Sequence, residues 1–440
     1  MKKFKIVVVG GGSTWTPGLL KSLCVKKDAF PLEELRLYDI DGQRQTPMGE
    51  FAQILFKEEY PELKFLYTTD KKTAYENVDF VFCQIRTGGY KMRLLDEHIP
   101  LSHGVVGQET CGAGGFAYGM RSIKDMIEIV NDARKYSDNP WILNYTNPAA
   151  IISVALDKAF PNDKRIINLC DQPINLLKSY GKLLDVDYRS LIPVYFGLNH
   201  FGWFKHLYDQ NGVDLVPKIR ESILKEGFLP ADAEERDKSW IETYGMVQMI
   251  LKDFPDYIPN TYLQYYLYPE YKAAHLDKDY TRADEVIGGR GKKVFDECAR
   301  VRKEGTAKGF SIAKNETHSD MIVDVARNIA YNLGGLFVMI TKNSGVISNF
   351  HRDAMVECTA LVNNQGVMPL AFGEIDVFSK GLMEIQYAYE SLTVEAYFER
   401  SYKKALQALT LNRTIGDAEK AKSILDDLID ANTGYWPELV

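Results

Sequence analysis

The feature that most constrains the fold is a buried strand that runs directly into a glycine-rich turn. Residues 6–9 (Ile-Val-Val-Val) form a continuous β-branched run, which is typical of a strand covered on both faces. A helical pattern follows from about Pro17. The turn between them consists of Gly10, Gly11, Gly12, Ser13 and Thr14. The order of strand, glycine turn and helix predicts a parallel βαβ unit.

The same turn is suited to holding a dinucleotide. Glycines let the backbone approach a pyrophosphate, which then lies at the helix N-terminus where free N–H groups point. Gly10 and Gly12 fit the GxGxxG pattern, whereas Trp15 stands where the third glycine belongs. Asp39, at the end of the second predicted strand, is placed to accept a hydrogen bond from a ribose 2′-hydroxyl, which favours NAD over NADP. The alternative is a tight turn that holds no ligand.

Strand-like and helix-like segments alternate over residues 1–196. Further strands are predicted at residues 35–39, 65–67, 80–84, 141–144 and 166–169. The clearest helical patterns between strands cover residues 123–136 and 149–160. Such alternation implies right-handed crossovers and an α/β fold, a Rossmann-like doubly wound parallel sheet. We therefore expect residues 1–196 to form an NAD-binding domain.

The alternation stops at about Gly197. Long helices are predicted at about 239–252, 317–333 and 393–409, together with short strand-like pieces such as 337–340. Polar stretches near 232–238 and 302–308 have the composition of surface loops or solvated helix faces. We expect residues 197–440 to form an α+β domain that completes the substrate cleft and carries an oligomer interface.

The composition excludes several classes of protein. Among 440 residues, 53 are basic and 60 acidic, so the net charge of −7 makes nucleic acid and anionic membranes unsuitable partners. The chain has no apolar run of about 18 residues, so we expect no membrane span. The basic N-terminus runs into glycines without a signal-peptide cleavage site, and the six cysteines form no CxxC pair. A cytoplasmic protein with mostly buried, reduced cysteines is expected.

Polar segments occur where the carboxyl edge of the predicted sheet should open. These segments are residues 86–93, 107–115, 144–148, 170–173 and 197–203. The second of them is too glycine-rich for a plain helix or strand. Loop residues held by a rigid sheet are where binding and catalytic groups concentrate. Each segment also has a simple structural interpretation, since Cys170 can be a buried thiol, His200 a core histidine, and Asn147 a helix cap.

Taken together, these segments resemble glycoside hydrolase family 4, the NAD- and metal-dependent glycosidases. The matching segments are residues 10–13, 107–112, 144–148, 170–173 and 197–203. Asp171 directly after Cys170 resembles the branch of the family that acts on 6-phospho-α-glucosides, as do residues 260–266 and 434–439. Gln172 and Ala113 depart from the pattern of that branch.

The resemblance implies a redox route rather than the scheme with two carboxylates that most glycosidases use. NAD⁺ takes a hydride from C3 of the sugar, a base removes the C2 proton, and the C1–O bond breaks by elimination. Water then adds and NADH returns the hydride, so the cofactor is regenerated in each turnover. The expected substrates are maltose 6′-phosphate and related phosphorylated disaccharides, and the expected product is glucose 6-phosphate.

The resemblance also implies a role for each residue of the site. Cys170 and His200 would bind Mn²⁺ or another divalent metal, which polarises the C3 oxygen. Asp171 matches the proton donor to the glycosidic oxygen, Tyr262 the C2 base, and Glu109 a group that raises the basicity of Tyr262. The expected substrate-binding residues are Arg93, Asn147 and Arg282, and an arginine fork suits a 6-phosphate.

Other functions remain open on the sequence. The architecture also resembles lactate and malate dehydrogenases, so an NAD-dependent 2-hydroxy-acid dehydrogenase is one alternative. Family 4 offers three further alternatives: a 6-phospho-β-glucosidase, an α-galactosidase, and an α-glucosidase that acts on unphosphorylated sugars. A catalytically inactive NAD-binding sensor is a further alternative. The presence of Cys170, Asp171, His200 and Tyr262 argues against it, because an inactive protein would not need all four residues. The resemblance also implies a homodimer or homotetramer.

Overall fold

The computed structural model describes residues 1–310 and 317–440. Over these residues the chain forms a nine-stranded sheet in the order β12-β11-β10-β6-β5-β4-β1-β2-β3 and a small antiparallel sheet in the order β7-β8-β9. The large sheet contains β1 (Phe4–Val9), β2 (Leu32–Tyr38), β3 (Lys64–Thr68), β4 (Phe80–Cys83), β5 (Trp141–Asn144), β6 (Ile166–Asn168), β10 (Gly335–Lys342), β11 (Met355–Asn363) and β12 (Gly366–Pro369). The small sheet contains β7 (Ile192–Leu198), β8 (Phe201–Tyr208) and β9 (Ile258–Pro259).

Strands β1 to β6 confirm the predicted Rossmann-like sheet. They are parallel and follow the order 3-2-1-4-5-6, which places the point where the strand order reverses between β1 and β4. Strands β10 to β12 are antiparallel and extend this sheet beyond β6, where Ile340 pairs with Asn168. Segments before and after residue 196 thus share one sheet, and the domain division at that residue stays a prediction.

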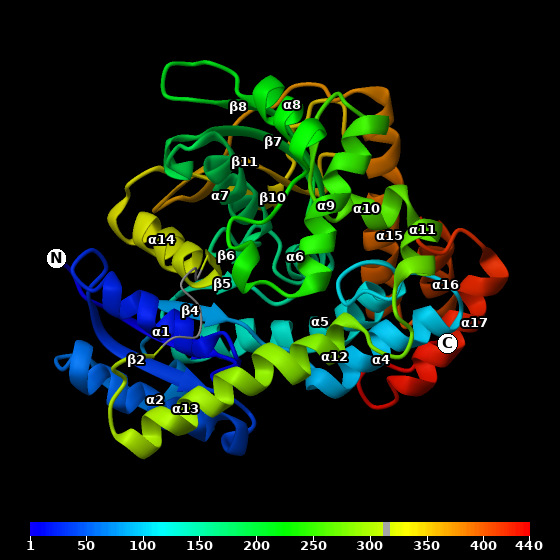
Figure 1. The fold of residues 1–440 in the computed structure, drawn as a ribbon. Coiled ribbons are helices and arrows are strands. Elements are labelled where there is room, and N and C mark those ends of the chain that lie inside the picture. Colours follow the sequence, from blue (N-terminus) through cyan, green and yellow to red (C-terminus); the bar gives the residue numbers. More distant parts are fainter. Residues whose placement is uncertain (311–316) are drawn as a thin grey trace.

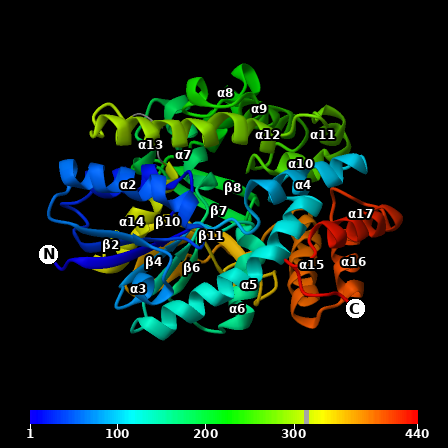
Figure 2. The same cartoon turned by 90° about the horizontal axis from the view of Figure 1, so that it is seen from below.

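Helices cover both faces of the sheet, because successive strand residues point to opposite sides. Ile6 and Val8 pack with α1, α2, α13 and α14, whereas Val7 and Val9 pack with α3, α5 and α6. Figure 2 shows α2 and α13 on one side of the sheet and α3, α5 and α6 on the other. These helices are α1 (Thr16–Val25), α2 (Gly42–Glu59), α3 (Lys71–Tyr75), α5 (Gly112–Tyr136), α6 (Ala149–Ala159), α13 (Lys292–Glu304) and α14 (Thr317–Tyr331).

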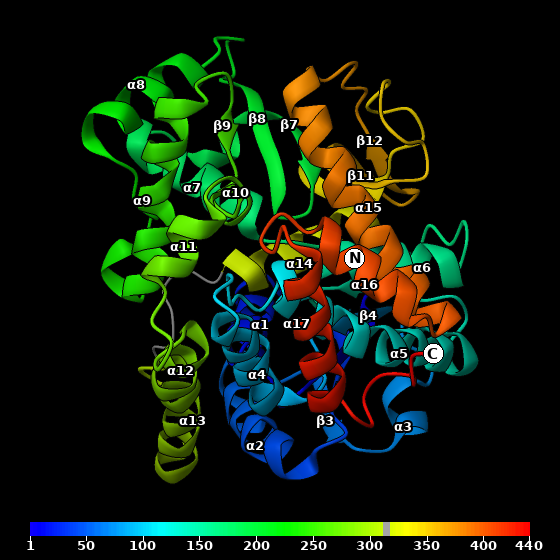
Figure 3. The same ribbon diagram turned by 90° about the vertical axis from the view of Figure 1, so that its right-hand side faces the viewer.

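The remaining helices complete the two ends of the molecule. Figures 1 and 3 show α8 and the small sheet at the end opposite α2 and α13. Helix α15 packs against α5 and α6, α16 packs against α5, and α17 packs against α16 and α4. The remaining α-helices are α4 (Gly89–Ser102), α7 (Gln172–Leu184), α8 (Val216–Glu226), α9 (Lys238–Asp253), α10 (Leu263–Leu267), α11 (Pro269–His275), α12 (Arg282–Val286), α15 (Val377–Glu399), α16 (Tyr402–Leu411) and α17 (Ala418–Ala431). Short 3₁₀ turns cover Tyr188–Ser190 and Ala233–Glu235, and a π-helical turn, η3, covers Ile287–Gly291.

The single helix predicted over residues 393–409 is wrong, because the structure divides it between α15 and α16. Arg400 adopts a left-handed conformation with φ of 54°, which ends α15. The Ser401 side chain then accepts a hydrogen bond from the Lys404 N–H and caps α16. The apolar pattern continues across this break, so periodicity alone could not locate it.

The expectation that residues 107–115 are too glycine-rich for a helix is also wrong in part, since α5 begins at Gly112. A Cβ atom at Gly114 would lie 2.3 Å from the carbonyl oxygen of Gln108 and 2.4 Å from that of Asp96. The glycines therefore permit close packing of the first turns of α5 against neighbouring backbone.

Candidate active site

One cavity of about 980 Å³ connects the glycine turn to the polar segments that follow β4, β5, β6 and β7. Among the residues expected in a site, those that line it are Gly10, Ser13, Thr14, Asp39, Arg93, Glu109, Asn147, Cys170, Asp171, His200, Tyr262 and Arg282. Gly11 and Gly12 shape the turn but do not line the cavity. The structure therefore brings predicted residues from segments far apart in the chain to one cavity.

The glycine turn is fixed by the end of β2. Gly10 has φ of +86°, a left-handed conformation that glycine adopts without strain. The Gly12 N–H donates to Asp39 Oδ2 at 2.8 Å. A Cβ atom at Gly11 would lie 2.4 Å from Gln45 Oε1. The turn has no room for side chains, so backbone can approach a pyrophosphate in the cavity, and the geometry fits a dinucleotide.

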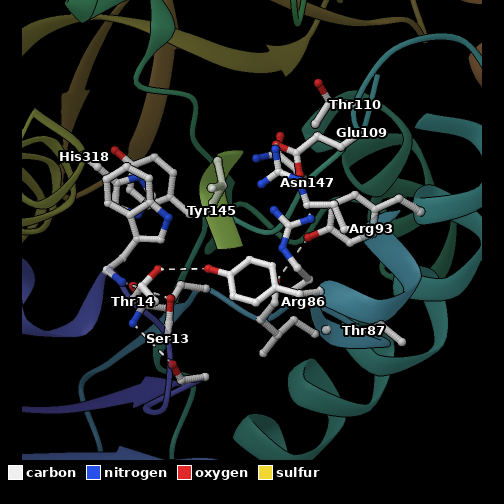
Figure 4. Close-up of a pocket in the computed structure, with 18 of the residues that line it drawn as sticks. Ser13, Thr14, Arg86, Thr87, Arg93, Glu109, Thr110, Tyr145, Asn147 and His318 are labelled. Atoms are coloured by element: carbon white, nitrogen blue, oxygen red, sulfur yellow. Dashed lines mark hydrogen bonds and ion pairs between the residues drawn. The ribbon is translucent and has the colours of Figure 1, made fainter. Parts of the chain in front are cut away.

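Trp15, the departure from the glycine pattern, contributes to an aromatic stack at the cavity. It precedes α1, and its ring lies 4.4 Å from that of His318, with an angle of 21° between the ring planes. The Tyr145 ring lies 3.8 Å from His318, and Figure 4 shows these two side chains against each other. The guanidinium of Arg290, in the π-helical turn, lies 3.2 Å from the centre of the Trp15 ring. Sequence reasoning missed His318 and Arg290, because neither belongs to a recognisable motif.

Cys170 and His200 meet although thirty positions separate them in the chain. Cys170 follows β6, and its Sγ lies 3.4 Å from Nε2 of His200. His200 occupies the two-residue turn between β7 and β8, where Leu198 pairs with Phe201, and has φ of 60°. A left-handed histidine in a tight hairpin is an unusual conformation, typical of positions held for function.

The pair offers one sulfur and one nitrogen donor to a divalent metal. Burial raises the pKa of the Cys170 thiol well above its usual value and lowers the pKa of His200 to about 4, so the imidazole is neutral. A neutral imidazole is the form that binds metals, whereas the thiol must lose its proton. Within residues 1–310 and 317–440, no group of three or more His, Cys, Asp or Glu side chains could hold a metal ion. A cation held by only these two protein donors would keep other coordination positions open for substrate oxygens, and the site fits such a cation.

Tyr262 lies directly against this pair. Its ring stacks on that of His200 with centroids 4.1 Å apart and an angle of 5° between the planes. Burial raises the pKa of Tyr262 well above its usual value, the Arg282 charge opposes that rise, and the Glu109 charge adds to it. The phenol is therefore protonated in the free protein, and its phenolate would be a strong base.

Glu109 pairs with two arginines, the half-buried Arg86 and the buried Arg93, on the other side of the cavity (Figure 4). Its carboxylate oxygens lie 2.7 Å from NH1 of Arg86 and 3.2 Å from NH2 of Arg93. Burial alone would raise the pKa of Glu109, but Arg86, Arg93 and Arg282 outweigh it and lower the pKa to about 2. Within the described chain NH2 of Arg93 has this ion pair with Glu109 but makes no hydrogen bond, so it retains donor capacity for a ligand.

Glu109→Gln should lower the free energy of unfolding by about 3 kcal/mol, the low end for breaking a buried ion pair, because the half-buried Arg86 loses its carboxylate partner whereas Arg93 keeps its ion pair with Glu97. The depressed pKa also predicts the pH dependence. The stabilisation by Glu109 is fully present above its unfolded pKa of about 4.3 and is lost as the pH falls through about 2. Urea unfolding with Glu226→Gln, an exposed glutamate, as control checks this. Equal stability of the two variants would contradict it.

Arg282 and Arg236 flank Trp240 on a third side of the cavity. Their guanidinium carbons lie 5.0 and 5.9 Å from the Trp240 ring centre. Arg282 NH1 donates to Ser239 Oγ at 2.5 Å, and Arg236 pairs with Asp232 at 2.8 Å. Residues 232–238 were expected to form a surface loop, and Glu234, Glu235 and Lys238 are exposed, but Asp232, Arg236 and Asp237 also line the cavity, which was not expected. A polar composition does not distinguish a polar cavity from bulk solvent.

Asp171 and Asn147 complete the predicted set. Asp171 immediately precedes α7, and its Oδ2 lies 3.7 Å from Nδ1 of His318. Burial would raise the pKa of Asp171, but contact with His318 and the charge of Arg236 lower it below its usual value. Asn147 precedes Pro148 through a cis peptide bond after β5 and lines the cavity.

The fold and the site define an α/β protein with a dinucleotide-binding turn that shares one cavity with a cysteine–histidine pair. The model of the family 4 glycosyl hydrolases matches residues 5–186, and the model of the family 4 C-terminal domain matches residues 195–415. The chain belongs to this family of glycosyl hydrolases.

Individual relatives are similar over the whole chain. A phospho-α-glucosidase of Clostridium acetobutylicum is 48% identical over 100% of both chains. The crystal structure of a 6-phospho-α-glucosidase from gut microorganisms, in complex with NAD and Mn²⁺, is 54% identical with a TM-score of 0.98. A second such enzyme, in complex with NAD and glucose 6-phosphate, is 41% identical with a TM-score of 0.96. Both structural matches cover 100% of each chain.

The expected likeness to malate dehydrogenase is confirmed for the fold alone. The enzyme of Plasmodium falciparum matches with a TM-score of 0.52 at 13% identity, over 92% of this chain and 99% of that one. Across the described residues, no helix is long and apolar enough to cross a membrane.

Proposed function

We propose that this protein hydrolyses 6-phospho-α-glucosides, such as maltose 6′-phosphate, with NAD and a divalent metal, Mn²⁺ by preference. The observation that carries the proposal is the single cavity that joins the glycine turn to Cys170, His200 and Tyr262. The redox route needs the nicotinamide, the metal and the base to reach one sugar ring, which a shared cavity permits. The two similar 6-phospho-α-glucosidase structures, one with NAD and Mn²⁺ and one with NAD and glucose 6-phosphate, support it.

The glycine turn and Asp39 would hold NAD, and Cys170 and His200 would hold the metal. When bound, NAD⁺ accepts and returns the C3 hydride, and the metal acts as a Lewis acid at the C3 oxygen. Tyr262 lies against His200 and removes the C2 proton. Glu109 strengthens that base electrostatically, since its charge raises the pKa of Tyr262.

Asp171 would give a proton to the glycosidic oxygen and take one back from the water that adds to C1. Arg93, Arg282 and Asn147 would bind the sugar and its phosphate. NH2 of Arg93, which has an ion pair with Glu109 but no hydrogen bond, and the fork of Arg282 are donors suited to phosphate oxygens.

We infer a cytoplasmic enzyme, because phosphorylated disaccharides arise on uptake through a sugar phosphotransferase system. We further propose that residues 1–196 form an NAD-binding domain, that residues 197–440 complete the metal and substrate site, and that the protein is a homodimer or homotetramer. Sedimentation velocity tests the oligomeric state, and a monomer at micromolar concentration would contradict it.

The test of the function is hydrolysis of the 4-nitrophenyl 6-phospho-α- and β-glucosides, with NAD⁺ and Mn²⁺ each present or omitted. We expect release of nitrophenol from the α anomer only when both are present. Release from the β anomer would make the protein a 6-phospho-β-glucosidase. No release, with NADH accumulating from a 2-hydroxy acid, would mean a dehydrogenase.

Asp171→Asn should lower kcat for maltose 6′-phosphate about 10²- to 10⁴-fold, the usual contribution of a general acid. The loss should be much smaller for the 4-nitrophenyl glucoside, because nitrophenolate leaves without a proton. Asp185→Asn, at the other end of α7, is the matched control. Equal losses on the two substrates would remove Asp171 from the acid role.

A further inference from the structure

Gln172, one of the two departures from the sequence pattern of the 6-phospho-α-glucoside branch, makes a contact that the proposed function does not use. It is the first residue of α7, directly after Asp171, and its side chain is buried. The side-chain amide donates to Thr261 Oγ1 at 2.7 Å. Thr261 is fully buried and directly precedes Tyr262. One hydrogen bond therefore joins the residue after the proposed acid to the residue before the proposed base.

The acid and the base belong to segments that the local chain does not hold together. Helix α7 follows β6 of the large sheet, whereas residues 260–262 follow β9 of the small sheet. Eighty-nine positions separate Gln172 from Thr261. General acid–base catalysis requires each group to lie within hydrogen-bond reach of its proton, and a misplacement of about 1 Å can cost about 10²-fold in rate. A direct link between the two segments is therefore suited to setting their distance.

Residues 260–262 are the firmly held side of this link. The Asn260 backbone N–H donates to the Gly202 carbonyl oxygen at 2.8 Å. The Asn260 side chain donates to Tyr195 Oη at 3.2 Å and accepts from the Tyr262 N–H at 3.1 Å. These bonds attach the segment to β7 and β8, so Thr261 is a fixed partner for a group on α7.

The Asp171 carboxylate is held by a longer contact. Its Oδ2 lies 3.7 Å from Nδ1 of His318, which exceeds the length of a normal hydrogen bond. Asp171 also precedes the first turn of α7, and the first N–H groups of a helix have no acceptor within the helix. The short bond from Gln172 to a fixed partner limits how far the start of α7, and Asp171 with it, can move.

We propose that Gln172 is a positioning residue, which acts through its hydrogen bond to Thr261 to hold Asp171 where it can protonate a sugar leaving group while Tyr262 reaches C2. The proposal rests on the proposed function, because it takes Asp171 as the acid and Tyr262 as the base. Gln172 lines the cavity, whereas Thr261 does not. A contribution that Thr261 shares with Gln172 therefore comes from their hydrogen bond and not from contact with the substrate.

The test is a double-mutant cycle with Gln172→Met, Thr261→Val and the variant that carries both changes. In each single variant kcat for maltose 6′-phosphate should fall about tenfold, with KM within about twofold of the wild type. The double variant lacks the same one hydrogen bond, so its kcat should also be about tenfold lower rather than about a hundredfold. For the 4-nitrophenyl 6-phospho-α-glucoside, whose leaving group needs no proton, kcat should fall less than about threefold.

Urea unfolding of the same variants separates positioning from a merely structural role. Each single variant leaves one buried polar group without its partner and should be less stable than the wild type, whereas the double variant has neither group and should recover most of that loss. A kcat that recovers together with stability in the double variant would overturn the positioning role. Losses that are equal on the two substrates, or losses that multiply to about a hundredfold in the double variant, would also overturn it.

Gln248→Met is the matched control. Gln248 lies on α9 outside the cavity, and its amide donates to the carbonyl oxygens of Ile223 and Leu224 on α8 at 3.1 and 3.0 Å. This variant should lower stability without changing the ratio of kcat on the two substrates, and a change in that ratio as large as in Gln172→Met would overturn the positioning role. A wild-type protein that cleaves neither substrate with NAD⁺ and Mn²⁺ would overturn the proposed function, and the positioning role with it.

Discussion

Cys170→Ser and His200→Ala should each abolish Mn²⁺-dependent hydrolysis, with kcat at least about a thousandfold below that of the wild type. The two side chains lie 3.4 Å apart and are the donors that we propose for the metal. Lewis-acid catalysis contributes several kcal/mol, and a thousandfold loss corresponds to about 4 kcal/mol. With one of two protein donors gone, the metal is held too weakly to contribute. Mn²⁺ titration of activity, together with direct Mn²⁺ binding by isothermal titration calorimetry, measures the effect.

The controls separate metal loss from unfolding. Cys24→Ser replaces a buried thiol of α1 outside the cavity, and His206→Ala replaces a histidine of β8 that pairs with Asp214. Both should retain Mn²⁺-dependent activity. All four variants should bind NAD⁺ as the wild type does, because the glycine turn is unchanged. Wild-type kcat in either Cys170→Ser or His200→Ala would contradict the metal assignment.

The parallel part of the fold was predictable because buried parallel strands have a distinctive pattern. Residues 6–9 are apolar at every position, since both faces of β1 are covered by helices. The glycines that follow the strand are a second signal, because a tight turn from a strand into a helix requires them. The three antiparallel strands β10 to β12 were less evident. Only residues 337–340 were predicted there, and nothing in their local pattern indicates that they pair with β6.

The site was predictable where its residues follow strands of the sheet, and not where they come from elsewhere. Cys170 and Asn147 occur directly after β6 and β5, so sheet topology alone brings them to one edge. His318, Arg236 and Arg290 reach the same cavity from helices and loops of the second half. Their positions depend on how that half packs over the sheet, which local sequence does not encode. The left-handed His200 likewise depends on the register of the β7–β8 hairpin.

Tyr262→Phe should lower kcat about 10²- to 10⁴-fold while leaving Mn²⁺ affinity close to that of the wild type. Phenylalanine keeps the ring that stacks on His200 at 4.1 Å, so the metal donors stay in place, and only the hydroxyl that takes the C2 proton is lost. In deuterated solvent the wild type should incorporate deuterium at C2 of the product, and residual turnover by the variant should show slower proton removal.

Tyr265→Phe is the matched control, since Tyr265 is a buried neighbour whose ring lies 6.0 Å from that of Tyr262 and which does not line the cavity. A loss of kcat in Tyr262→Phe without any loss in Tyr265→Phe assigns the effect to the hydroxyl that faces the substrate rather than to a disturbed aromatic cluster. A loss confined to KM would instead mean that Tyr262 binds the sugar and that another group removes the proton. The isotope measurement decides the same point independently, because a base that acts at C2 must change the rate of that step, whereas a binding residue leaves it unaltered once the site is saturated.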